Sequence, residues 1–122
     1  MQPKKEDFNI MRGDTFTFSV RARQDGQPIM LGENGRITFA LQRLGGPPVI
    51  FKKEYRAADQ NEDGYVVITL RPVETETLSE NGNYQSEVEY RLSAVYVLTV
   101  LWGRITVKND IITPDVRDGD GS

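Results

Sequence analysis

The chain has 122 residues, of which 38% are hydrophobic and 27% charged, a composition typical of one globular domain. Its 15 basic and 18 acidic residues give a net charge of −3, so it lacks the excess positive charge with which proteins bind nucleic acids or anionic membranes. It contains no cysteine and no histidine, which excludes disulfides, cysteine-ligated metals and a Ser-His-Asp triad. We therefore expect a protein that is not an enzyme, with no cofactor, no metal site, and neither a nucleic-acid nor a membrane partner.

The N-terminal residues, MQPKKEDFNI, contain no apolar run, so the sequence predicts no signal peptide. We expect residues 1–9 to form an N-terminal arm. The longest apolar stretch, residues 95–102, is too short to cross a bilayer.

The first half of the chain alternates between polar and apolar residues, the pattern of half-buried strands. It predicts a strand over 14–21, a turn at Asp25-Gly26, and a short partner strand over 28–31 that Pro28 confines to a sheet edge. A second turn cluster leads into a strand over 36–42. The residues expected to face inward on the two longer strands are Phe16, Phe18, Val20, Ile37, Phe39 and Leu41.

After Gly45-Gly-Pro-Pro48, the sequence predicts strands over 49–54 and 65–70, separated by a polar loop. Residues 71–81 form the only helical candidate, with Pro72 at its first position and Leu78 as its apolar anchor.

Two longer strands close the domain. Residues 84–92 alternate cleanly, and a tight turn near 93–94 leads into the most apolar segment, 95–107, where Gly103 is the expected position of a bulge. The tail after residue 113 is acidic and expected to be mobile.

Short strands punctuated by Gly, Pro and Asn predict an all-β domain over residues 10–112. The predicted architecture is a two-sheet antiparallel β-sandwich, Ig-like, with one short helical turn near 72–79. A small barrel is the alternative. The arm over 1–9 and a flexible acidic tail over 113–122 flank the domain.

Two short motifs match known sites but have simpler interpretations. Arg12-Gly13-Asp14 spells the integrin-binding tripeptide, yet nothing in the sequence indicates secretion, so we interpret it as a glycine turn before a strand. Residues 59–64 match the first half of an EF-hand loop, but the position of its closing glutamate holds Leu70. We interpret this segment as a turn as well.

Glu87 and Glu89 lie on one face of the predicted strand, about 7 Å apart. This spacing is near that of the carboxyl pair of retaining glycosidases. Since Gln85 and Arg91 share the same face, an ordinary solvated face is the preferred interpretation, and a small glycosidase using Glu87 and Glu89 is the least favoured hypothesis. No catalytic residue is assigned.

The segment 95–102 is apolar on both of its alternating faces, whereas a sandwich strand normally has one wet face. It therefore needs a second cover, either from within the chain (residues 71–82 or the N-terminal arm) or from another subunit. The internal cover is slightly preferred. If the face is exposed, it marks an interface. The candidate interface residues are Tyr96, Leu98, Val100 and Trp102.

Aromatic side chains also serve as platforms for sugar rings. Tyr84 and Tyr90 are in phase with Val88 and are expected in the core, which leaves Tyr96 and Trp102 as the better candidates. A carbohydrate-binding module that uses these two residues, joined by a surface Tyr55, is the alternative functional hypothesis.

The order of motifs resembles the small β-sandwich domain at the N-terminus of phage baseplate upper proteins. The resemblance covers roughly residues 10–116. It rests on the opening Arg12-Gly-Asp-Thr-Phe-Thr-Phe-Ser-Val20, on the strand and short helix in Ile68-Thr-Leu-Arg-Pro-Val-Glu-Thr-Glu-Thr-Leu78, and on a closing hairpin from Asn81-Gly-Asn-Tyr84 to near Pro114-Asp-Val116.

The resemblance implies a phage or prophage structural protein, in a tail, baseplate or fibre-attachment role, and brings no catalytic residue with it. The implied partners are other virion proteins and further copies of the same chain, whereas a glycan partner follows from the carbohydrate hypothesis above. The implied location is the virion, after synthesis in the bacterial cytoplasm.

Overall fold

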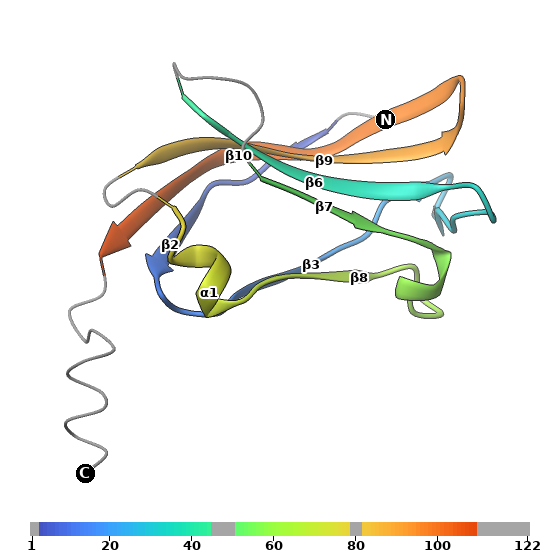
Figure 1. Cartoon of the computed structure of the whole chain (residues 1–122). Coiled ribbons are helices and arrows are strands. Elements are labelled where there is room, and N and C mark those ends of the chain that lie inside the picture. The colour runs from blue at the N-terminus through green and yellow to red at the C-terminus, as the bar shows by residue number, and fades with distance from the viewer. Residues whose placement is uncertain (1–2, 45–50, 79–81, 110–122) are drawn as a thin grey trace, which may run out of the picture.

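The computed structural model describes residues 3–44, 51–78 and 82–109, and it confirms an all-β fold in which sheets pack face to face (Figure 1). The expected tail over 113–122, the end of the expected helical segment at 79–81, and residues 49–50 of an expected strand lie outside these ranges.

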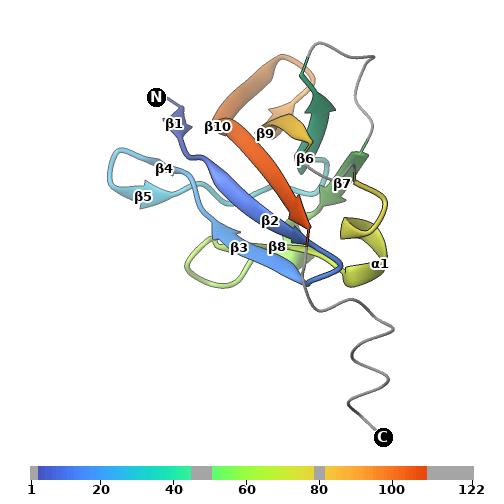
Figure 2. The ribbon, with the colours of Figure 1, turned by 90° about the vertical axis from the view of Figure 1, so that its left-hand side faces the viewer.

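The larger sheet has six strands. Its order is β1 (Lys4–Lys5), β10 (Tyr96–Asn109), β9 (Asn83–Ser93), β6 (Arg36–Arg43) and β7 (Phe51–Tyr55), and β2 (Phe8–Arg12) follows β1 along the same edge of β10. Neighbours from β10 to β7 are antiparallel, but β1 and β2 run parallel to β10. Figure 2 shows β1 and β2 alongside β10. The first and last strands of the described chain are thus joined in one sheet.

The opposite layer is smaller. It consists of β3 (Phe16–Val20) paired with β8 (Val66–Leu70), and a separate hairpin of β4 (Arg23–Gln24) and β5 (Gln27–Pro28) lies beside it. Both turn residues of this hairpin have positive φ, 53° at Asp25 and 78° at Gly26, as a tight two-residue turn requires. The predicted turn is confirmed, although the partner strand is shorter than expected.

The core lies between the two layers, and the inward sets expected from the alternation are confirmed. Ile37, Phe39 and Leu41 on β6 are fully buried, as are Tyr84 and Tyr90 on β9. Aromatic rings connect the layers, since Phe18 of β3 lies 4.9 Å from Phe8 and 5.6 Å from Phe39, measured between ring centroids. Such contacts stabilise the packing of one sheet on the other.

A single helical turn, α1 (Pro72–Thr75), follows β8, and a 3₁₀ turn, η1 (Ala57–Asp59), precedes β8. Proline at the first helical position confirms the expected start of α1, and Leu78 is buried as its anchor. The fully buried Thr75 hydroxyl donates to the carbonyl oxygen of Asp14 and accepts from the backbone N–H of Gly13. These bonds hold α1 against the turn between β2 and β3.

That turn contains the integrin-like tripeptide. All three residues are half-buried, and the Arg12 side chain donates to the carbonyl oxygen of Leu78. Gly13 has φ of 91°, a conformation that favours glycine. The tripeptide therefore forms a packed turn before β3, which confirms our interpretation of this motif as a glycine turn.

The side chains of β10 do not alternate between the two faces in the order that the sequence predicted. The register of β10 against β9 shifts between Tyr96 and Val97 and again between Thr99 and Leu101, so the bulges lie there and the prediction of a bulge at Gly103 is wrong. Because Val100 is the extra residue, Val100 and Leu101 both enter the core. Beyond the bulge, the opposite set of alternate residues of β10 faces the core. Apolar residues therefore occur in both alternating sets of the sequence, although only one set is buried on each side of the bulge.

Gly103 has a different role, since the backbone of the N-terminal segment between β1 and β2 lies against it. A Cβ atom added at Gly103 would collide with the backbone carbonyl of Glu6. The Glu6 N–H donates to the carbonyl oxygen of Trp102, and the Asp7 carboxylate accepts from the backbone N–H of Arg104. The glycine lets the N-terminal segment approach this closely.

Candidate binding surface on the six-stranded sheet

We call the solvent-facing side of the six-stranded sheet the outer face. Directly paired residues on neighbouring strands point to the same side, so the register assigns side chains to this face. One row crosses all five strands of the sheet order, because Lys5 pairs with Trp102, Trp102 with Glu87, Glu87 with Ala40, and Ala40 with Lys52. Ala40 is the small member of this row, and it leaves room above the middle of the sheet.

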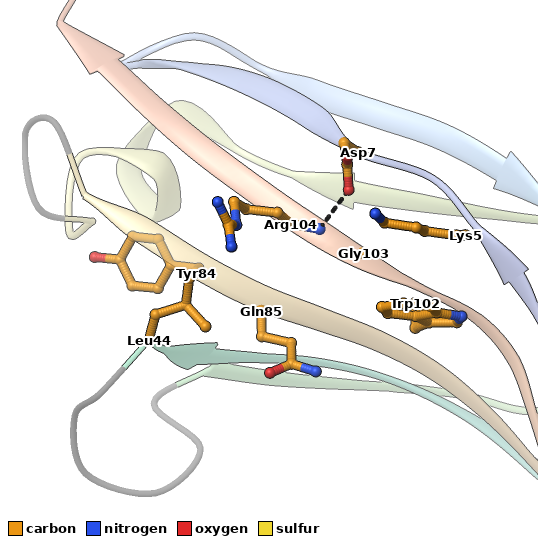
Figure 3. A pocket seen from close by; sticks show the side chains of 8 residues that line it. All are labelled: Lys5, Asp7, Leu44, Tyr84, Gln85, Trp102, Gly103 and Arg104. Carbon is orange, nitrogen blue, oxygen red and sulfur yellow. Dashed lines mark hydrogen bonds between the residues drawn. The ribbon is translucent and has the colours of Figure 1, made fainter.

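Two shallow hollows open on the outer face. The first, of about 320 Å³, lies over β10 and the N-terminal segment, where Figure 3 shows Lys5, Trp102 and Gln85 around one opening. The second, of about 360 Å³, lies over β6 and β9 above Ala40. Gln85 lines both hollows, so they form neighbouring parts of one surface.

The charges around the two hollows are unbalanced. Five basic side chains line them, namely Lys5, Arg36, Lys52, Arg91 and Arg104. Three acidic side chains do so, namely Asp7, Glu87 and Glu89. The surface is locally positive on a chain whose net charge is −3.

Trp102 is the aromatic residue of the first hollow. It is 38% exposed, and the Lys5 ammonium lies 5.5 Å from its ring centroid, within the range of a cation–π contact. The parallel pairing of β1 with β10 places Lys5 there. Since β1 pairs edge to edge with β10, it extends the sheet and does not cover a face.

The four candidate interface residues do not share one face, and the prediction that they do is wrong because of the bulge at Val100. Leu98 pairs with the buried Tyr90 and packs against the core, and Val100 is only 7% exposed. Tyr96 is 43% exposed, with its hydroxyl 3.5 Å from the Gln24 amide, whereas Trp102 lies on the outer face. Tyr96 and Trp102 are the exposed members of the set.

A separate apolar surface lies at the tip of the β9–β10 hairpin. Val95 is 94% exposed, and Tyr96 and Val97 are 43% and 40% exposed. We call these three residues the hairpin tip. Exposed apolar side chains that form one contiguous patch mark candidate contact sites.

The carbohydrate hypothesis expected Tyr55 on the surface, and this expectation is wrong. Tyr55 is half-buried against the core. Burial raises the pKa of its hydroxyl, an effect that hydrogen bonding to the Thr69 backbone partly offsets. Tyr55 therefore cannot join Trp102 in a sugar platform.

Glu87 and Glu89 both lie on the outer face and have local partners. Glu87 accepts a hydrogen bond from the Thr99 hydroxyl, and Glu89 lies 3.9 Å from the Arg91 guanidinium. These contacts fit the solvated face that we preferred over a catalytic pair.

The loop with the EF-hand-like sequence uses its polar side chains for its own backbone. Asn61 accepts from the N–H groups of Asp63 and Tyr65, and Asp59 accepts from the N–H of Arg56. The Gln60 amide bonds to Leu31, Ile29 and Gly64, which joins this loop to the chain after β5. The contacts are those of a turn.

Sequence reasoning placed Gln85 and Arg91 on one strand face but missed Arg36 as a residue of the same surface. Their polar positions in alternating strands were visible, but any such strand exposes polar residues to solvent. Only the register of β6 against β9 brings Arg36 beside Arg91.

No protein-family model matches the chain, and none of the curated proteins matches it. Within the three described ranges, none of the helices has the length and apolar character needed to cross a membrane.

Proposed function

We propose that this protein is a non-enzymatic structural component of a phage or prophage virion, in the tail, baseplate or fibre-attachment region, and that it acts through protein–protein contacts. The motif order of the sequence supports the virion assignment. The exposed hairpin tip supports the contact role.

The hairpin tip is the observation that carries the proposal. Val95, Tyr96 and Val97 stand at the end of the longest hairpin, away from the core that would otherwise bury them. Burying them against a partner removes apolar surface from water, which favours association. We infer that further copies of this chain or other virion proteins cover this tip.

Light scattering behind size-exclusion chromatography, over a wide range of protein concentration, tests self-association. We expect oligomers in the wild type, and weaker association in Val95→Ser and Val97→Ser with an unchanged circular dichroism spectrum. Val67→Ser is the matched control, because Val67 is an exposed valine (56%) on β8 in the opposite sheet. A wild type that stays monomeric throughout would contradict self-association through the tip.

The virion assignment has its own test. Particles released from a prophage-carrying source culture after induction should contain the chain, detected by a specific antibody on purified, nuclease-treated particles. Its absence from intact particles would contradict the assignment.

A further inference from the structure

The outer face contains two arginines directly opposite each other. Arg36 of β6 pairs with Arg91 of β9, and both half-buried side chains line the second hollow. Directly paired residues have Cβ atoms about 5 Å apart, and like charges at this separation destabilise a sheet.

Neighbouring groups of the protein neutralise this pair only in part. Within the described chain, the Arg36 guanidinium has no hydrogen bond and no ion pair. Arg91 has only a 3.9 Å approach to Glu89 and a 3.5 Å contact with the carbonyl oxygen of Ala94, and its buried Nε has no hydrogen-bond partner in these ranges. A buried donor without a partner is uncommon in folded proteins. An anion between the two guanidinium groups would offset their like charge, and a carboxylate matches the planar arginine fork.

The other groups of the surface have the chemistry of saccharide recognition. Trp102 offers an exposed ring, and the side-chain amides of Gln42 and Gln85 offer both donors and acceptors to hydroxyl groups. Ligand sites typically combine an apolar or aromatic wall with a few such polar groups.

We propose that the outer face binds an acidic saccharide, with a carboxylate between Arg36 and Arg91 and a sugar ring against Trp102. Arg91 and Glu87 are four residues apart on β9, about 14 Å, and Trp102 pairs with Glu87. This span is longer than one sugar ring, so the site suits a short oligosaccharide. The residues of the site are not those of the hairpin tip, although Val97 of the tip pairs with Arg91. The saccharide titration is therefore done at a protein concentration at which light scattering shows one oligomeric state.

Intrinsic tryptophan fluorescence can follow binding at this site, because Trp102 is the only tryptophan. The fluorescence of Trp102 should change saturably when trigalacturonate or sialyllactose is added, and not when neutral maltotriose is added at the same ionic strength. Arg36→Gln should weaken binding of the active saccharide roughly tenfold or more, as expected for loss of a charged hydrogen bond. Arg23→Gln is the matched control, since it removes the same charge from the exposed strand β4.

Thermal unfolding separates this role from a structural one. Without ligand, Arg36→Gln should melt at the wild-type temperature or higher, because the variant loses like-charge repulsion. A lower melting temperature with unchanged saccharide affinity would overturn the proposal. So would a failure of both acidic saccharides, an equal response to maltotriose, or a response only to a penta-glutamate peptide, which would assign the face to an acidic protein segment.

Discussion

At the scale of single residues, Gly103 is the position where the fold depends most directly on the absence of a side chain. The backbone of Glu6 lies so close to it that a Cβ atom has no room, and the obstacle is main chain that cannot rotate away. The pairing of β1 and β2 with β10, before and after this contact, would have to be disrupted to make space.

We therefore expect Gly103→Ala to lower the free energy of unfolding by about 3 kcal/mol, the upper range for overpacking in a close-packed site. Urea unfolding measures this, and hydrogen exchange should show faster exchange in residues 4–12. Gly32→Ala is the control, because a Cβ atom there meets nothing within 4 Å. Equal stabilities of the two variants would contradict the close contact between Glu6 and Gly103.

Tyr90 is a second residue whose environment has a measurable consequence. Burial raises the pKa of its hydroxyl to about 12, and the backbone of Ala22 offsets this only in part. The unfolded chain ionises near the ordinary value of 10.0, so above that pH the unfolded state binds fewer protons than the folded state.

The stability of the wild type should accordingly fall as pH rises from about 10 towards 12, by about 1.4 kcal/mol per pH unit from this group. Tyr90→Phe should remove this part of the slope while keeping the ring in the core. Urea titrations of both proteins at pH 8, 10 and 11 compare the slopes, and identical slopes would show that Tyr90 ionises as freely as in the unfolded chain.

At the scale of elements, an ion pair and a hydrogen bond of the same lysine connect β7, α1 and β8. The Lys53 ammonium on β7 lies 2.8 Å from the Glu74 carboxylate on α1, and it also donates to the carbonyl oxygen of Thr69 on β8 at 2.6 Å. Glu74 accepts from the backbone N–H of Arg71, which caps α1. Burial alone would raise the pKa of the Glu74 carboxyl, but the bonds from Arg71 and Lys53 outweigh it and hold the pKa below its ordinary value.

Glu74→Gln should therefore cost about 1–2 kcal/mol of unfolding free energy at pH 7, since both groups are largely buried and hydrogen-bonded. A carboxyl with a lowered folded-state pKa stabilises the protein above its ordinary value of 4.5 and loses this contribution as pH falls through the folded value. The difference between wild type and variant should shrink below pH 4.5. Exposed Glu33→Gln is the control, and a cost independent of pH would contradict the ion pair's role.

At the scale of the whole molecule, the first and last strands of the described chain pair with each other. β2 pairs with the final strand across most of the sequence, as Phe8 lies opposite Ile105. Ile10 of β2 is 1% exposed and belongs to the common core, whereas its neighbour Met11 points outward. Since these contacts require almost the entire chain, the N-terminal strand should contribute to global stability and not only to a local arm.

Ile10→Ala should thus cost about 2–5 kcal/mol, the range for deleting a large buried aliphatic side chain, in one cooperative transition. Met11→Ala on the same strand should cost less than about 1 kcal/mol. Chemical denaturation followed by circular dichroism and by Trp102 fluorescence measures both. Non-coincident transitions would instead indicate an N-terminal strand that detaches independently.

The sequence by itself determined the fold class, most strand positions and the inward-facing residues of β3, β6 and β9. When one face of a strand is buried, apolar and polar residues alternate along it, and this alternation is visible in the local sequence. The sequence also determined the short helical turn at Pro72 and the hairpin turn at Asp25-Gly26, since proline and positive φ restrict the backbone locally.

Tertiary structure alone decided the pairing of β1 and β2 with β10, the bulge at Val100 and the juxtaposition of Arg36 with Arg91. Register depends on contacts between residues far apart in the chain, and one extra residue in β10 exchanges its inner and outer faces. For this reason the sequence grouped Trp102 with Val100, whereas the folded chain places Trp102 on the outer face and Val100 in the core.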